Sequence, residues 1–211
     1  MATNHYPRYL SAPLNDSDPA MTRLPSAIAL MLGLTMLLPS ATIAGGATYE
    51  RTYPLLINPT SHEATAFYAE FRGRNEASGF GHSYIVLGIV DSTGETRQTV
   101  VAGFLPRSAD DDRWSKIGVP VTGLVGVARS DFTRRPDVRF RIALSRARYY
   151  RVVAKVYDLS RTWTTYELLL RNCNNFVSEV ADEAGLRTPI LTAQLPVWYI
   201  GELRALNSHN P

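Results

Sequence analysis

The sequence predicts an α+β domain in which an antiparallel sheet packs against helices. Two observations lead to this prediction. Apolar and β-branched runs separated by turn residues fill residues 64–104, and a second strand pattern follows at 138–144. Capped helical patterns then occupy much of 145–206, and one of them carries the single cysteine of the 211-residue chain. We therefore expect the sheet to come first and the cysteine-bearing helix to pack against it.

The first strands are predicted from composition and turn signals. Ala64–Arg72 is typical of a strand, and Gly73–Gly81 is a polar loop that contains glycine. His82–Val90 is β-branched and apolar throughout, which is typical of a central strand. Asp91–Gly94 supplies a turn, so Glu95–Phe104 is expected to return beside it as the second strand of a hairpin.

The middle of the chain is predicted to hold loops and one more strand. The acids at 110–112 are expected to lie in a polar, solvated loop, and residues 118–126 form a stretch rich in glycine and proline. Beyond it, apolar and polar residues alternate with a period of two, which predicts a half-buried strand. The apolar members are Val138, Phe140, Ile142 and Leu144.

Helices are predicted from caps and apolar spacing. Ser145 caps a helix with the stripe Ala147, Tyr150, Val153, Ala154 and Tyr157. A strand-like run at 165–170 leads to a second helix, capped by Asn172, that starts at Cys173 and ends at Gly185. Its packing face is Phe176, Val177, Val180 and Ala184. A last helix is expected over 196–206, packed through Val197, Ile200, Leu203 and Leu206.

The N-terminal part has the organisation of an export signal. Residues 21–44 contain a positive start, an apolar run and a small-residue cleavage site, whereas residues 1–20 are a polar extension that looks non-native. The apolar run is shorter than the roughly 20 residues that span a bilayer, so we expect cleavage and a periplasmic or secreted product. An uncleaved, signal-anchored form is the alternative. The mature chain, 45–211, is expected to be one domain with its core at approximately 64–189.

The basic residues are nearly all arginine, and the formal net charge is +3. Eight arginines fall between Arg129 and Arg151, where they form either a solvated surface or a site for an anionic envelope polymer. Export makes nucleic acid an unexpected partner. The dispersed histidines and single cysteine do not make a metal-ligand pattern, and we expect neither a metal nor another cofactor.

The most informative residue is Cys173, because a lone cysteine in an exported protein has no disulfide partner within its own chain. At the first turn of a helix, the macrodipole and free N–H groups are expected to lower the thiol pKa and to stabilise an oxyanion. Thiol catalysis also requires a base, and His82 is the only histidine at the start of a predicted core strand. The alternative is that Cys173 is a small buried apolar residue and His82 is structural.

Two motifs resemble a known superfamily. The string LLLRNCNNFVSEVADEAGL at 168–186, preceded by FGHSYIVLG at 80–88, is similar to circularly permuted members of the NlpC-type papain-like superfamily, the group that includes lecithin:retinol acyltransferase-like proteins. The resemblance implies a papain-like fold, with Cys173 as nucleophile and His82 as base. The third polar residue of the family lies on the strand after the histidine strand, which carries Gln98 and Thr99 here. Alternation lets only one of them face the site, and Gln98 is the expected counterpart because its amide can accept from an imidazole N–H.

The resemblance implies acyl transfer through a Cys173 thioester, most directly hydrolysis of amide bonds in envelope peptides such as peptidoglycan stems. Asn172, Asn174 and Tyr84, which flank the pair in the sequence, are the expected substrate contacts. Two alternatives remain open at this point. One is an acyltransferase or thioesterase acting on an acyl lipid, and the other is a non-catalytic envelope-binding module that keeps a papain-like cleft.

Overall fold

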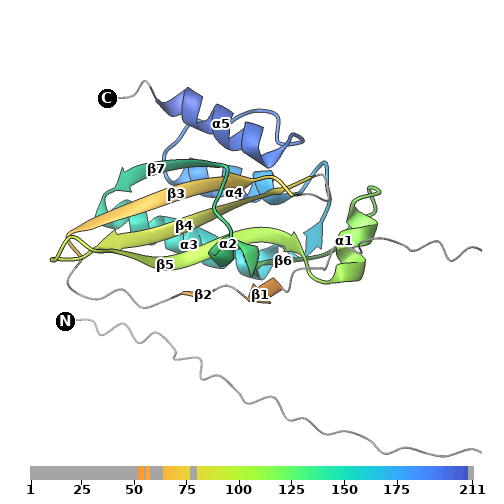
Figure 1. Ribbon diagram of the computed structural model, residues 1–211, viewed down its shortest axis with the longest axis horizontal. Helices are drawn as coiled ribbons and strands as arrows, with labels where there is room; N and C mark the ends of the chain where they lie inside the picture. Colours follow the sequence, from red (N-terminus) through yellow and green to blue (C-terminus); the bar gives the residue numbers. More distant parts are fainter. Residues whose placement is uncertain (1–51, 55, 58–63, 77–79, 209–211) are drawn as a thin grey trace, which may run out of the picture. The chain divides into compact units, whose positions relative to one another are not determined.

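The domain is built on an antiparallel sheet with helices packed mainly on one face (Figure 1). The computed structural model describes residues 52–54, 56–57, 64–76 and 80–208. Within this part of the chain, six strands follow the order β1-β6-β5-β4-β3-β7, β2 pairs with β5, and β8 pairs with β6. The strands are β1 (Thr52–Pro54), β2 (Leu56–Ile57), β3 (Ala66–Arg74), β4 (His82–Val90), β5 (Thr96–Pro106), β6 (Val121–Ala128), β7 (Val138–Leu144) and β8 (Thr165–Tyr166).

Five helices are described in the same part of the chain. They are α1 (Ala109–Ser115), α2 (Ser130–Thr133), α3 (Arg146–Thr162), α4 (Cys173–Glu183) and α5 (Pro196–Asn207). The predicted α+β class and the antiparallel sheet against a cysteine-bearing helix are therefore confirmed, since α4 packs on β4 and β5. The expected extension at 1–20 and signal at 21–44 lie outside the described residues.

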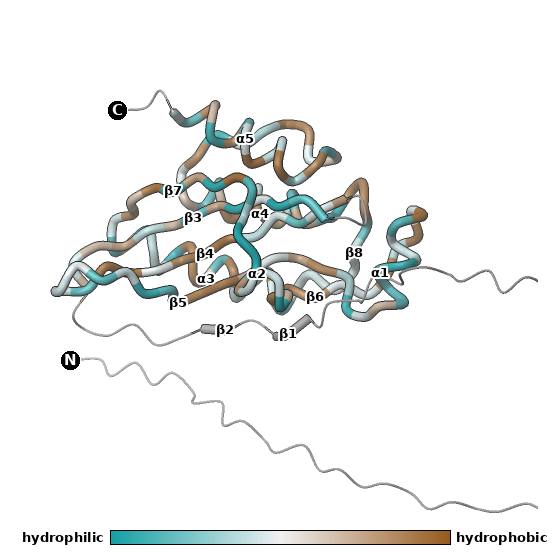
Figure 2. The backbone as a smooth tube through the Cα atoms, viewed as in Figure 1, coloured by the Kyte–Doolittle hydropathy of each residue, from teal (hydrophilic) through white to brown (hydrophobic). Residues whose placement is uncertain are grey.

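The central hairpin forms as predicted because its turn satisfies its own polar groups. The Asp91 carboxylate accepts hydrogen bonds from the backbone N–H groups of Thr93 and Glu95, at 2.9 and 3.0 Å. Gly94 has a φ of 83°, a left-handed conformation that costs glycine little. β5 is exposed over its first three residues and becomes buried beyond them, and in Figure 2 its tube changes from teal to brown.

The two faces of the sheet bury different sets of side chains. Odd-numbered residues of β4, such as Ile85 and Leu87, belong to the main core with side chains of α3, α4 and α5. Even-numbered residues of β4, Tyr84 and Val86, belong to a separate cluster with Tyr68, Val101 and Val127. We call these the helix face and the outer face of the sheet. Because successive strand residues point to opposite faces, each β4 side chain belongs to one face only.

The cysteine-bearing helix forms as the sequence predicts. Its cap residue, Asn172, accepts hydrogen bonds from the N–H groups of Asn174 and Asn175, and the Asn175 side chain accepts one from the Asn172 N–H. The helix ends at Glu183, and Gly185, two residues on, has a φ of 82° that turns the chain away as predicted. The predicted packing face is buried, and full burial of an aliphatic or aromatic side chain contributes about 1.5–3 kcal/mol. Its members are Phe176, Val177, Val180 and Ala184.

Four details differ from the predicted elements. The acids at 110–112 lie in α1, because Ser108 caps a helix there. Residues 118–126, noted only as rich in glycine and proline, supply much of β6, a strand that was not predicted and that forms through its pairing with β5. The run at 165–170 is a strand only over β8. α3 buries Tyr149, Val152, Val156 and Leu159, whereas Tyr150 and Tyr157, of the predicted stripe, are each 43% exposed.

Two predicted packing patterns hold in large part. The alternation in β7 is confirmed, with exposed Arg139 and Arg141 between half-buried apolar residues. α5 begins at the expected proline and buries Ile200 and Leu203. It also buries Tyr199, which the predicted face omitted. No helix in the described residues has the length and apolar character needed to cross a membrane.

Candidate functional site

Cys173 is the first residue of α4 and lies against the helix face of β4. Its side chain is buried, with 6% exposure. Ser83 and the backbone N–H groups of Ser83 and of the first helical turn lie close to its sulfur. The predicted position of the thiol at a capped helix start is therefore confirmed.

The asparagines beside the cysteine hold two loops against the helix. The Ser83 hydroxyl donates to Asn174 Oδ1 at 2.8 Å, and Asn174 Nδ2 donates to the carbonyls of Thr192 and Gln194 at 2.9 and 2.8 Å. Asn172 Nδ2 donates to the Leu168 carbonyl at 2.7 Å. Asn172 and Asn174 are 4% and 1% exposed. Their amides are thus occupied in the interior, and the structure does not present them as the expected substrate contacts.

The burial of the thiol works against its ionisation. Burial raises the pKa of the Cys173 thiol, because a thiolate there loses its hydration. Hydrogen bonds from Ser83 and from the helix N–H groups act in the opposite direction but do not cancel the effect. The expected lowering of this pKa is therefore wrong, and the reason is the apolar packing around the helix start.

His82 does not lie on the same face of the sheet as Cys173. Ser83 faces the cysteine, so the preceding residue, His82, points to the outer face. A Cβ atom added to Gly103, which pairs with Tyr84 on that face, would lie 2.5 Å from His82 Nε2. The expected thiol–imidazole pair is thus not assembled. The sequence motif identified the strand that lies beside the cysteine helix. Within that strand, however, Ser83 points to the helix face and the adjacent His82 points to the outer face.

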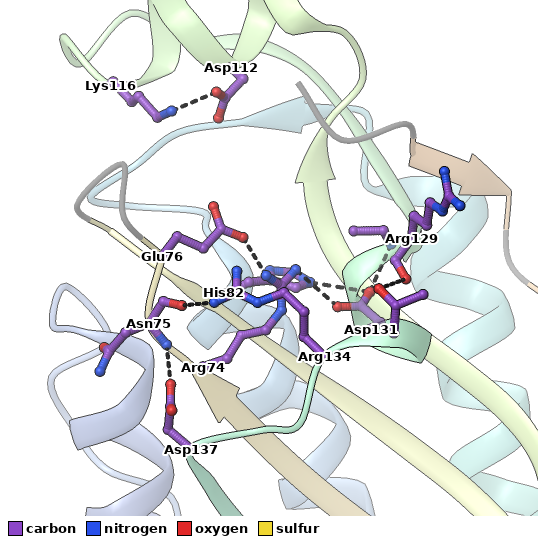
Figure 3. Close-up of polar contacts among 12 residues, drawn as sticks. Arg74, Asn75, Glu76, His82, Asp112, Lys116, Arg129, Asp131, Arg134 and Asp137 are labelled. Carbon is purple, nitrogen blue, oxygen red and sulfur yellow. Dashed lines mark hydrogen bonds and ion pairs between the residues drawn. The ribbon is translucent and has the colours of Figure 1, made fainter. Parts of the chain in front are cut away.

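On the outer face, His82 belongs to a charged cluster with Arg74 and Asp131, shown in Figure 3. Asp131 Oδ1 lies 3.2 Å from Arg74 NH2, and Asp131 Oδ2 lies 3.9 Å from His82 Nε2, beyond hydrogen-bond range. The imidazole also stacks on Tyr84, with ring centroids 5.7 Å apart. His82 Nε2 is buried and has no hydrogen-bond partner among the described residues. Burial, with the nearby Arg74 cation, holds the pKa of His82 well below its usual range.

The other expected site residues lie away from the thiol. Gln98 pairs with Gly88, six positions along β4 from His82, which corresponds to about 20 Å in a strand. Gln98 is exposed, and its neighbour Thr99 points to the core instead. The reason is the hairpin geometry, which places the start of β4 opposite the end of β5. Tyr84 is buried on the outer face, where Arg72 lies over its ring.

The arginine-rich stripe is divided by the fold between two surfaces. Arg146, Arg148 and Arg151 lie on α3, which covers the helix face. Arg148 bonds to the Ala184 carbonyl, and Arg151 pairs with Glu183 at 3.1 Å. The remaining arginines lie on or next to the outer face, together with arginines of β3. We use the term arginine face for the side chains of Arg72, Arg134, Arg139 and Arg141.

The arginine face contains two arginines directly opposite each other. Arg72 of β3 and Arg139 of β7 are register partners in neighbouring strands. Glu70 neutralises part of this surface, since its carboxylate lies 2.5 Å from both Arg72 Nε and Arg141 Nε. Arg139 is exposed and makes no ion pair with any described residue. Arg72 is neutralised by Glu70, so Arg139 is the member of this pair whose charge has no acidic partner among the described residues.

Sequence reasoning missed Ser83, Arg74 and Asp131 as site residues. Ser83 follows the histidine, and strict alternation along β4 was the only signal that it, rather than His82, faces α4. No sequence spacing relates Asp131 to His82, because the two residues are far apart in the chain. They come together only because α2 follows β6, which lies two strands from β4 in the sheet. Among the described residues there is no group of three or more His, Cys, Asp or Glu side chains that could hold a metal ion.

Comparison with family models, with curated proteins and with solved structures found no match for the chain. The resemblance to permuted papain-like proteins therefore stays a prediction.

Proposed function

We propose that this domain is a non-catalytic module that binds an anionic polymer through the arginine face. The observation that carries the proposal is the position of Arg139 opposite Arg72, without an acidic partner among the described residues. Like charges directly opposite each other in a sheet destabilise it, although Glu70 offsets part of this cost by pairing with Arg72. A bound anion between the two guanidinium groups would convert that cost into a favourable interaction.

The chemistry of the surface fits carboxylate or phosphate groups. A guanidinium presents a planar fork of N–H donors that matches either group with two hydrogen bonds. Glu70 is already occupied by Arg72 and Arg141, and it holds both side chains in place. Arg134 donates to the Asn75 carbonyl just beyond β3, at 3.4 Å, which keeps it near the same surface. A polymer with repeated anionic groups can contact several of these arginines at once.

A papain-like scaffold of the permuted NlpC type is part of the same proposal. Two features support it: the sheet precedes the cysteine helix in the chain, and α4 packs on the strand that follows the Gly-His motif. The opposite orientations of Cys173 and His82 favour a binding role for this scaffold. If the chain is exported, as residues 21–44 predict, the partner is an anionic polymer of the cell envelope.

The test is binding to two defined polyanions, polygalacturonate for carboxylates and polyphosphate for phosphates. We expect saturable, salt-sensitive binding of at least one, and about tenfold weaker binding after the double change Arg134→Gln and Arg139→Gln. Arg146→Gln is the matched control, because Arg146 is also exposed but lies on α3. Binding that is absent in the native protein, or equally weakened by the control, contradicts the proposal.

Acyl transfer by Cys173 is the second candidate, in the hydrolase or acyl-lipid form. The observation that favours it is the N–H donors of the α4 start and of Ser83 around the sulfur, an arrangement that suits an oxyanion. Iodoacetamide labelling of the folded protein between pH 6 and 10 distinguishes the candidates. A binding module predicts labelling slower than that of a free thiol at every pH. Rapid labelling below pH 8 would instead favour the enzyme, as would a thioester trapped on Cys173 with a peptidoglycan peptide or an acyl lipid.

A further inference from the structure

A groove of about 690 Å³ lies between α1 and the paired strands β6 and β8. It is shallow and open to solvent, so it suits a ligand that lies along the surface rather than one enclosed in a cavity. It is distinct from both the arginine face and the thiol. The described residues that line it are Asp111, Trp114, Val119, Pro120, Val121, Thr122, Thr164 and Thr165.

One wall of the groove is an exposed aromatic platform. The Trp114 side chain on α1 is 53% exposed, and Val119 beside it is 40% exposed. The Trp114 carbonyl accepts hydrogen bonds from the N–H groups of Ile117 and Val119, each at 3.2 Å. These bonds bring the backbone of Val119 close to that of Trp114. The exposed indole presents a flat apolar surface to a ligand.

The opposite wall presents hydroxyl groups. Thr122 and Thr165 are register partners of β6 and β8, so their side chains share one face of this strand pair. The next pair, Val121 and Tyr166, has its tyrosine buried in the core, which places the two threonines on the side away from the core. Thr164 is fixed beside them, because its carbonyl accepts a hydrogen bond from the Gly123 N–H at 2.8 Å.

We propose that this groove binds a neutral pyranose glycan. The apolar face of a sugar ring stacks on an indole, while its hydroxyl groups need partners that both donate and accept, which threonine hydroxyls and the Asp111 carboxylate supply between them. No lysine or arginine is among the described lining residues, so an anionic ligand has no counter-charge in the groove. This site goes beyond the proposed polyanion binding and does not depend on it.

An extended peptide is a poorer fit to the same groove. A peptide that adds to a sheet needs an unpaired strand edge for its backbone hydrogen bonds. In β6, residues 121–122 already pair with β8, residues 123–126 with β5, and residues 126–128 with β1. β8 is only two residues long, too short an edge for an extended peptide to add to. The polar groups that remain in the groove are side-chain hydroxyls and a carboxylate, which suit sugar hydroxyls.

The test is titration of the full chain with two neutral oligosaccharides, chitohexaose and cellohexaose, followed by calorimetry. We expect saturable binding of at least one and a loss of at least tenfold in affinity for Trp114→Ala. Trp198→Ala is the matched control, since Trp198 is 65% exposed on α5 and does not line the groove. The nearly isosteric change Thr122→Val with Thr165→Val should weaken binding severalfold with the platform intact.

Three outcomes would overturn the assignment. They are failure of both oligosaccharides to bind the native protein, equal binding by Trp114→Ala, and equal losses in the Trp114 and Trp198 variants. Saturable binding of an uncharged peptide that depends on Trp114, with neither oligosaccharide bound, would assign the groove to peptides instead. Because the probes are uncharged, the Arg134→Gln and Arg139→Gln variant should bind them normally, which separates this test from the one for the arginine face.

Discussion

Replacing Gly103 with alanine tests the orientation of His82, on which the interpretation of the thiol site depends. Gly103 pairs with Tyr84 on the outer face of the sheet. A Cβ atom at this position would lie 2.5 Å from His82 Nε2, 2.7 Å from His82 Cε1 and 3.1 Å from Tyr84 Cβ. The first two distances are too short for carbon in contact with a ring atom, so the buried imidazole has to move.

The expected cost follows from the packing. Adding one methyl group to a well-packed interior destabilises a protein by about 1–3 kcal/mol. For a protein of this size, each kcal/mol lowers Tm by about 2–4 °C. Removal of the ring by His82→Ala takes away the atoms that collide with the new methyl group. The double variant should therefore be less destabilised than the sum of the single variants, with a coupling free energy of about 1–2 kcal/mol.

The measurement is urea denaturation of the four proteins of this cycle, with Gly201→Ala as the control. Gly201 lies in α5, and a Cβ atom there would meet nothing within 4 Å, so alanine should be neutral or stabilise the helix by up to about 1 kcal/mol. If His82 pointed to Cys173 instead, the Gly103 and His82 changes would be additive within about 0.5 kcal/mol. Additivity would therefore refute the orientation described above and restore the thiol–imidazole pair as a candidate.

Three further predictions follow from the same contacts. The pKa of His82 is lowered in the folded state, so only the unfolded state takes up its proton as the pH falls below about 6.5. The free energy of unfolding should therefore be highest above that pH and decrease below it. His82→Gln should flatten this slope in urea denaturation between pH 7 and 5, and an unchanged slope would count against the buried neutral imidazole. Arg139→Gln should raise the free energy of unfolding by no more than about 0.5 kcal/mol, because Glu70 already neutralises Arg72, and a loss of stability would show that Arg139 makes a favourable contact instead. Asn172→Ala should cost about 1–2 kcal/mol through loss of the α4 cap. Asn172→Ser, which keeps a capping oxygen, should cost less, and equal losses in thermal unfolding would mean that the cap contributes little.

Local patterns were sufficient to predict most of the elements that carry the candidate site. The capped start of α4 follows from Asn172 and the apolar spacing after it, because a helix end satisfies its N–H groups with residues adjacent in sequence. The hairpin of β4 and β5 follows from the same kind of local signal, the turn at Asp91 and Gly94. Where partners distant in sequence decide, β6 was missed and the predicted stripe of α3 was wrong.

By itself, the sequence determined that Cys173 starts a helix and that His82 starts a central strand, since caps and apolar runs act within a few residues. Only the tertiary structure decided that Ser83 meets the thiol and that His82 meets Arg74 and Asp131. A strand places its side chains alternately on two faces, and the helices pack on the face where they bury the larger apolar area. Which face that is depends on the whole core, and in this fold the imidazole lies on the side of the sheet away from the cysteine.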